Sequence, residues 1–347
     1  LDLNNIDICY FRCNNNKLAD RLKLHTSHEM RTAIKRNISQ FDLVHLHECR
    51  SIPNLYASYY CHKYNIPYVM QAHGACPIRI EGQSMGTMLI KIAFDSLVGK
   101  KALLNASKVI ALTETEKEQY EIMGINEKKI CIIPNGINLN DYEYDYNIDE
   151  FKKKHSIDTR DRLILYLGRL SKSKGIDLLI RAFSKIDSDI NCKLLLIGPD
   201  ENYRSELERL IGALGLKDNV IFTGFINDRE KIMVLRSADV FITPNFSGFP
   251  VTFLEACACS TPIITTNKGD KLDWIHNNVG YVIDYDDVIL KNTIMKLLCN
   301  DELRFKFGRQ GEYIVKNQFN WRYIVEDIET VYYNIIKDRK VIHEDFY

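Results

Sequence analysis

The stretch TPNFSGFPVTFLEACACSTPIITT, residues 243–266, carries the pattern that decides the fold. A loop broken by glycine and proline leads into a short apolar helix expected over 251–258, and a β-branched strand expected over 261–266 follows at once. This succession is typical of a parallel sheet, because parallel strands need a crossover segment between them. A loop of this kind can also leave unpaired backbone N–H groups at a helix N-terminus, where an anion is favoured.

The same alternation of short apolar strands and longer helices extends outward in both directions. Further strands are expected at 42–48, 66–74, 107–113, 129–136, 163–170, 193–200, 219–225 and 239–245. Further helices are expected at 54–65, 113–124, 175–186, 203–215 and 228–238. The pattern predicts an α/β protein made of two doubly wound, Rossmann-like domains that face each other across a cleft, with ligands at the carboxyl ends of the strands.

A domain boundary is expected within the polar, tyrosine-rich segment 137–162, which contains no long apolar run. The first domain then covers residues 1–145 and the second covers 146–320, followed by an amphipathic C-terminal helix within 321–347. A length of 347 residues is enough for two domains with a core each.

Composition narrows the class of protein. Lys plus Arg and Asp plus Glu both number 46, so no global field attracts the chain to nucleic acid, and no nucleic-acid partner is predicted. The ten cysteines contain no C-x-x-C pair, which indicates free thiols in a reducing compartment. There is no apolar run of about eighteen residues and no signal peptide, so the sequence predicts a cytoplasmic protein.

The loop GRLSKSKG, residues 168–175, is the first candidate for chemistry. A strand ends at Gly168, Arg169 follows at its carboxyl end, and Lys174 precedes the next helix. Two cations on one strand-to-helix loop suit a diphosphate, since a charge-assisted hydrogen bond contributes roughly 1.5–3 kcal/mol. The alternative is a solvated basic loop without a ligand.

The start of the 251–258 helix is the second candidate. Val251 and Thr252 supply the first helical N–H groups, and Glu255 lies about a turn further on. A carboxylate accepts hydrogen bonds from a vicinal diol such as a ribose. The alternative is an ordinary helix start in which glutamate is a favourable charge.

Together these segments resemble a known family. In order and spacing, the stretches 168–175, 194–200, 219–225 and 243–264 are similar to the donor domain of the family 4 glycosyltransferases of the GT-B fold. DLVHLHE, PYVMQAHG, ASKVIALTETEKEQY and CIIPNGIN resemble the acceptor domain of the same family. The resemblance covers about residues 41–321. It implies an enzyme of polysaccharide biosynthesis that moves a hexose from a UDP- or GDP-sugar to a glycan or lipid-linked acceptor, with retention at the anomeric carbon.

The resemblance also implies roles for single residues. Arg169 and Lys174 are expected to neutralise the diphosphate leaving group, and His73 is expected to face the reacting sugar, although a structural histidine at a strand end is the alternative. No cofactor and no metal are implied, and the C-terminal helix is expected to cross back towards the first domain. Donor-binding residues implied by the match are Gly168, Gly224, Phe225, Ser247, Gly248, Phe249, Pro250, Val251, Thr252 and Glu255.

Three departures from the family pattern stand out. Ser247 occupies the position of the first carboxylate of a Glu-x7-Glu pair, which contacts hydroxyls of the donor sugar. Pro250 replaces a common glycine and removes one N–H from the anion seat. No strand and glycine-rich loop of the family's usual kind precede the opening segment LDLNNIDICYF, so the chain is expected either to be a fragment or to have lost them.

Other clusters leave alternatives open. His45 and His47 alternate on one strand face, as a metal pair or as structural side chains. The segment 85–104 places Lys91, Lys100 and Lys101 around an apolar helix, which predicts either a buried helix or a peripheral contact with the inner face of a membrane.

Cys257 and Cys259, near the end of the expected 251–258 helix, are expected to be core thiols, since residues two apart do not share a helix face. Two rival functions remain at this stage. One is a non-catalytic protein that binds a nucleotide sugar or a partner, and the other is a sugar-nucleotide epimerase or a phosphorylase on the same fold.

Overall fold

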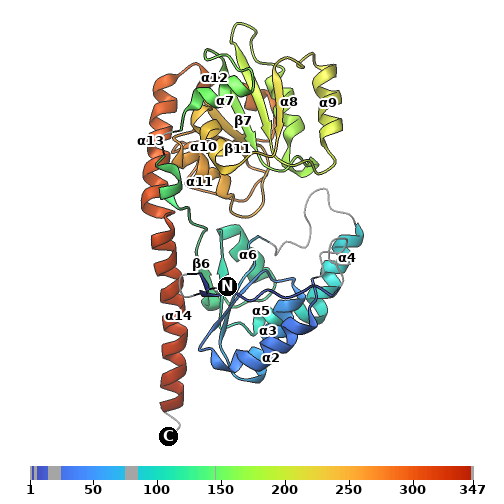
Figure 1. Cartoon of the computed structure of the whole chain (residues 1–347), viewed down its shortest axis with the longest axis vertical. Coiled ribbons are helices and arrows are strands. Elements are labelled where there is room, and N and C mark those ends of the chain that lie inside the picture. The colour runs from blue at the N-terminus through green and yellow to red at the C-terminus, as the bar shows by residue number, and fades with distance from the viewer. Residues whose placement is uncertain (1, 4–5, 15–24, 75–84, 145, 345–347) are drawn as a thin grey trace. The chain divides into compact units, whose positions relative to one another are not determined.

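The chain folds into two compact units (Figure 1). The computed structural model describes residues 2–3, 6–14, 25–74, 85–144 and 146–344. The first unit comprises Leu1–Ile133 with Glu326–Tyr347, and the second comprises Pro134–Val325. Residues 134–144, which the sequence places in the first domain, therefore belong to the second unit. The reason is local contact: Ile137 forms a β-bridge with Asn320, and the Tyr142 hydroxyl donates to Glu255.

The second unit is built on a six-stranded sheet with the order β12-β11-β10-β7-β8-β9. All of its strand pairs are parallel. The strands are β7 (Arg162–Leu167), β8 (Cys192–Ile197), β9 (Val220–Gly224), β10 (Val240–Thr243), β11 (Ile263–Thr266) and β12 (Gly280–Ile283). The order reverses between β7 and β10, and doubly wound sheets bind ligands outside the carboxyl ends of the strands at such a switch point.

Helices cover this sheet in two groups. They are α7 (Ile148–Lys154), α8 (Ile176–Phe183), α9 (Arg204–Ala213), α10 (Asp228–Ser237), α11 (Val251–Ala258), α12 (Asp287–Leu298) and α13 (Asp301–Gln318). Helix α8 contacts α9 and α12, whereas α10 contacts α7 and α11, and α11 contacts α13. Successive side chains of β7 point to opposite faces of the sheet. On one face, Ile164 and Tyr166 belong to the same hydrophobic core as Leu179 of α8. The sheet is buried on both faces, as the near-continuous apolar strands predict.

The first unit has a four-stranded parallel sheet in the order β3-β4-β5-β6, in which β3 is an edge strand. Its strands are β3 (Val44–His47), β4 (Tyr68–Gln71), β5 (Lys108–Ala111) and β6 (Ile130–Ile132), and a separate antiparallel pair joins β1 (Asp2–Leu3) to β2 (Ile6–Asp7). Its helices are α2 (His28–Asn37), α3 (Ile52–Lys63), α4 (Met85–Phe94), α5 (Lys100–Leu104), α6 (Glu114–Ile122) and the greater part of α14 (Trp321–Glu344). All nine strands expected from the sequence are present, so the α/β, doubly wound fold class is confirmed.

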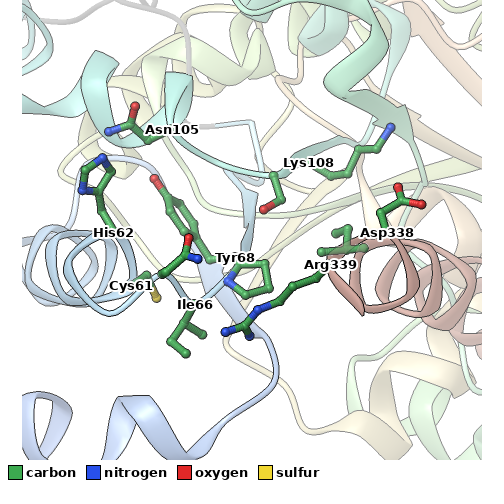
Figure 2. A pocket seen from close by; sticks show the side chains of 12 residues that line it. Cys61, His62, Ile66, Tyr68, Asn105, Lys108, Asp338 and Arg339 are labelled. Carbon is green, nitrogen blue, oxygen red and sulfur yellow. The ribbon is translucent and has the colours of Figure 1, made fainter. Parts of the chain in front are cut away.

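A cavity of about 580 Å³ opens at the amino end of the first sheet (Figure 2). Tyr68 and Lys108, which begin β4 and β5, line it together with Cys61 and His62 of α3 and Arg339 of α14. No residue expected in the functional site lines this cavity. His73 follows β4 at the opposite, carboxyl end of the sheet, so the two features are separate.

Candidate functional site

Three glycines at the carboxyl ends of β7, β8 and β9 form a surface of bare backbone, here termed the glycine floor: Gly168, Gly198 and Gly224. The Gly168 N–H donates to the carbonyl of Ile197 (2.9 Å), and the Gly198 N–H donates to the carbonyl of Gly224 (3.0 Å). A Cβ at Gly198 would lie 2.0 Å from the Gly168 oxygen, so only glycine fits there. The main chains of neighbouring strand ends therefore pack closely against each other, and all three glycines remain half-buried.

The basic loop follows directly from this floor. Arg169 pairs through Nη1 with Oε1 of Glu201 at 2.5 Å, and both side chains are largely exposed. Lys174 ends a short 3-10 turn (Lys172–Lys174), and its pKa is lowered, first by burial and then by the positive charge of Arg169, which Glu201 only partly offsets. Among the residues that the structure describes, Lys174 has no ion-pair partner. The two cations lie close enough to disfavour each other, and a bound anion would relieve that repulsion.

The loop after β10 lies against this basic loop. Asn245 donates from Nδ2 to the carbonyl of Ser173 at 2.9 Å. Gly175 adopts a left-handed conformation (φ 69°), and a Cβ on it would approach Pro244 Cβ to 3.0 Å and the Tyr285 hydroxyl to 2.9 Å. The structure thus brings together the two segments that the sequence singled out, one from each central strand of the switch point.

Helix α11 begins from this second loop. Pro250 is its N-cap residue and makes no side-chain capping bond, and its carbonyl accepts from the N–H of Phe253 at 3.0 Å. The N–H groups of Val251 and Thr252 find no acceptor within the described part of the chain. The N–H of Gly248 is already engaged, because it donates to Oδ2 of Asp270 at 2.9 Å. Two free N–H groups and the helix dipole therefore make an anion seat at this terminus.

Other predicted donor-site residues differ in their surroundings. Phe249 is buried and packs against Trp274 and Phe319, with ring centroids 6.5 and 5.5 Å away, so its side chain holds the loop in place and does not face solvent. Ser247 is exposed, and Phe225 is 82% exposed just beyond the end of β9. The latter two side chains are available to a ligand.

Glu255 in the second turn of α11 is buried but paired. Its Oε1 accepts from Lys231 Nζ at 2.8 Å and from the Tyr142 hydroxyl at 3.3 Å. Burial alone would lower the pKa of Lys231, but hydrogen bonds to Asp228 and Glu255 outweigh it and raise that pKa. Glu255, Lys231, Tyr142 and Val251 line a cavity of about 500 Å³. Neither Lys231 nor Tyr142 could be predicted from the sequence, because no motif places them near Glu255.

His73 in the first unit belongs to a stack of three histidines. Its Nε2 lies 2.7 Å from Nδ1 of His47, and their ring centroids are 5.0 Å apart. His45 stacks on His47 at 4.3 Å and contacts the Tyr332 hydroxyl through Nδ1 at 2.5 Å. Burial lowers the pKa of all three rings. The pKa of His45 falls furthest, to about 4, because the charges of His47 and His73 lower it as well. Neutral imidazoles are therefore favoured in this stack.

Hydrogen bonds to Glu116 of α6 hold the turn that carries His73. His73 has a left-handed backbone (φ 54°), and the next N–H, that of Gly74, donates to Oε1 of Glu116 at 2.7 Å. The other oxygen, Oε2, accepts from the N–H of Leu112 at 2.7 Å. Thr113 caps α6 by accepting from the Glu116 N–H, so the same short stretch begins the helix and holds the turn.

The structure also bears on the predicted histidine pair, the two cysteines near the end of α11 and the apolar helices. In the described residues there is no group of three His, Cys, Asp or Glu side chains placed to hold a metal ion, His45 and His47 included. Cys257 and Cys259 are buried and free, as expected for core thiols. None of the helices in the described ranges is long and apolar enough to cross a bilayer.

Comparison with known proteins identifies the family. The model of the glycosyl transferases group 1 matches residues 147–313, and the model of Glycosyltransferase Family 4 matches residues 10–141. The chain belongs to the family 4 glycosyltransferases of the GT-B fold, and it is a transferase enzyme. The alternative hypothesis of a non-catalytic binding protein is therefore rejected.

Relatives of known sequence are moderately similar. An uncharacterized glycosyltransferase of Methanocaldococcus jannaschii is 28% identical over 309 residues, which cover 85% of this chain and 76% of the relative. The capsular polysaccharide biosynthesis glycosyltransferase CapM of Staphylococcus aureus is 31% identical over 251 residues, covering 70% and 65%. Among solved structures, Anabaena HepE in complex with UDP and glucose gives a TM-score of 0.76 at 17% identity, covering 95% of this chain and 87% of HepE. This last likeness shows the shared fold.

Proposed function

We propose that the enzyme transfers a hexose from a UDP- or GDP-sugar to a glycan or lipid-linked acceptor with retention at the anomeric carbon, and without a metal ion. The observation that carries the proposal is the position of Lys174. It has no ion-pair partner among the described side chains, it lies within the electrostatic reach of Arg169, and its loop packs against the loop before α11. A diphosphate matches this set of two cations and two free N–H groups.

The chemistry follows from where charge develops. As the bond between the anomeric carbon and the phosphate oxygen breaks, negative charge grows on the leaving diphosphate. Arg169, Lys174 and the N–H groups of Val251 and Thr252 would stabilise that charge, which is the work a divalent cation does in other transferases. The acceptor hydroxyl oxygen forms the new bond to the anomeric carbon, and its proton passes to the departing diphosphate oxygen.

The other proposed donor contacts follow the family resemblance. Glu255 accepts hydrogen bonds from the ribose hydroxyls, while Gly224 and Phe225 lie beside the base. Ser247 takes the position next to the donor sugar. His73 keeps its proposed catalytic role towards the reacting sugar, supported by the fixed turn and by the hydrogen bond to His47.

Calorimetric titration of the 347-residue chain with UDP and GDP, followed by donor-hydrolysis and transfer assays with a panel of nucleotide sugars, tests this proposal. We expect one of the two nucleotides to bind and its sugars to be turned over. Lys174→Ala and Glu255→Ala should each weaken binding while the melting temperature stays near that of the wild type. Absence of binding by either nucleotide would refute the donor site, and inversion at the anomeric carbon would refute retention.

A membrane contact is the second part of the proposal. On α4, Met85, Leu89 and Ile92 are 69%, 58% and 37% exposed, and their spacing places them on one helix face. Lys100 and Lys101 are exposed at the start of α5. The side chain of Lys91 lies outside the described part of the molecule. This combination of apolar and basic side chains suits the surface of an anionic membrane that carries a lipid-linked acceptor.

Sedimentation with vesicles of phosphatidylglycerol and phosphatidylcholine tests this contact. Leu89→Asp should lower the vesicle-bound fraction severalfold, since it introduces a charge into the apolar face. Ile122→Asp is the control, because Ile122 is 85% exposed on α6 of the same unit. Equal loss in both variants, or no binding by the wild type, would contradict a membrane contact at α4.

A further inference from the structure

The carboxylate of Glu255 uses only one of its two oxygens inside the protein. Both donors, Lys231 Nζ at 2.8 Å and the Tyr142 hydroxyl at 3.3 Å, bind Oε1. Over the described residues, Oε2 receives no hydrogen bond. The carboxylate is thus held at one end and left open at the other, on the wall of the cavity of about 500 Å³.

The residues that hold Glu255 are themselves well fixed. The side chain of Lys231 is 21% exposed and also binds Oδ1 of Asp228 at 2.8 Å, one turn earlier on α10. Asn227 begins that helix with a capping box formed with Glu230, which fixes the turn that carries Lys231. Burial, together with the negative charge of Glu255, raises the pKa of Tyr142 well above its usual range, so its hydroxyl stays protonated and donates.

We propose that Lys231 and Tyr142 are positioning residues that hold the Glu255 carboxylate so that Oε2 accepts the ribose hydroxyls, and that this arrangement makes the enzyme select ribonucleotides over 2′-deoxyribonucleotides. The inference rests on the ribose contact assigned to Glu255 above. A diphosphate and a buried carboxylate in one site repel each other, and the ammonium of Lys231 offsets that repulsion without competing for Oε2. A site built to accept a substrate hydroxyl discriminates against the analogue that lacks it.

Titration with paired nucleotides tests the inference. The wild type should bind UDP, or GDP, about tenfold or more tightly than the corresponding 2′-deoxy nucleotide, as expected for a hydrogen bond to a charged group. Lys231→Met should weaken UDP binding by about tenfold and reduce the ribose preference to about twofold, since the carboxylate loses its charged partner and its fixed orientation. Binding of the 2′-deoxy nucleotide should change much less, a pattern that a general loss of structure would not produce.

A matched control is available in the same unit. Lys291 on α12 is also 21% exposed and pairs at 3.3 Å with Asp187, whose side chain is 62% exposed, so Lys291→Met removes an equally buried lysine away from Glu255 and should leave both affinities unchanged. Tyr142→Phe, which removes one hydroxyl, should reduce the preference by a smaller factor and serves as the second variant if Lys231→Met fails to fold.

The outcomes separate the two proposals. If the wild type prefers the ribonucleotide and both variants keep that preference, or if Lys231→Met binds UDP more tightly, the positioning role is wrong while the donor site stands. If the wild type binds UDP and 2′-deoxy-UDP equally, the ribose contact and the positioning role are both wrong, but the diphosphate seat stands. If neither UDP nor GDP binds at all, the proposed function falls as well.

Discussion

The carboxylate of Glu116 accepts a hydrogen bond from the N–H of Gly74, which lies 42 positions earlier in the chain. This bond connects helix α6 to the turn that carries His73. Glu116 is 1% exposed, and its second oxygen accepts the N–H of Leu112 at the end of β5. One buried side chain therefore joins two strand ends of the first sheet. His73 adopts the left-handed conformation, which is uncommon for residues other than glycine although histidine is enriched in it, and the bond from Gly74 to Glu116 holds the turn next to it.

Glu116→Gln should lower the free energy of unfolding by about 2–3 kcal/mol, because one amide N–H₂ would then face a backbone N–H inside the protein. Glu118→Gln, an exposed position on the same helix, should have no measurable effect. Urea denaturation compares the three proteins. Equal stability of the two variants would show that the carboxylate of Glu116 does not hold the turn.

Lys174→Ala should weaken UDP or GDP binding by about tenfold to a hundredfold, the value of one hydrogen bond to a charged group. Lys172→Ala provides the comparison within the same turn. The Lys172 side chain is 77% exposed, and its Nζ lies 3.8 Å from Oε1 of Glu206. Calorimetry measures both. A similar loss in the two variants would point to the general charge of the loop instead of a specific seat at Lys174.

Glu201→Gln should strengthen nucleotide binding modestly, by about 1.5- to 5-fold, which corresponds to an exposed ion pair of roughly 0.2–1 kcal/mol. In the free enzyme Arg169 is paired with Glu201, and a diphosphate has to compete with that carboxylate. Removing the charge leaves Arg169 available. Weaker binding in this variant would mean that Glu201 contacts the ligand or positions Arg169 for it.

The histidine stack should make the first unit sensitive to acid. The pKa of His45 is lowered from 6.5 to about 4, by burial first and then by the charges of His47 and His73. Between these values the unfolded chain binds a proton that the folded chain resists, so stability is complete above about 6.5 and falls as the pH drops towards 4. The group that also contacts His45 is the Tyr332 hydroxyl, which carries no charge in this range.

Thermal melts from about pH 7 to about pH 4.5 measure this dependence. His45→Asn should show a shallower decrease in melting temperature than the wild type, since the variant has no group to titrate there. Parallel curves for the two proteins would assign the acid sensitivity to other residues.

Much of the fold could be predicted from the sequence, because each of the nine expected strands is a short apolar run between turn residues. Strand β12 and helices α2, α7, α12 and α13 are among the elements that the sequence does not predict. β12 has only four residues and begins with glycine, and α13 contains Gly308 and Gly311, which lower helix propensity. Packing explains α13: Gly308 faces the carbonyl of Ser260 so closely that a Cβ would lie 2.4 Å from it. Such a contact between distant segments leaves no local signal.

The candidate site divides in the same way. Arg169, Lys174 and the start of α11 follow strands of one parallel sheet, so their approach to a common edge could be predicted from the order of the elements. The partners of Glu255 could not. Tyr142 lies 113 positions before it, in a segment that the sequence placed in the other domain. Nor could the sequence show that the N–H of Gly248 is taken by Asp270, or that Phe249 faces the core.

The glycine floor restricts which substitutions the ends of the central strands can accept. The chain at Gly168, Gly198 and Gly224 carries no side chains, and a side chain at Gly198 is excluded by a carbonyl oxygen 2.0 Å from where its Cβ would be. The exposed side chains of Ser247 and Phe225 face no such close contact. Replacing Gly198 would therefore force the ends of two neighbouring strands apart, whereas an exchange at Ser247 or Phe225 alters only an exposed side chain.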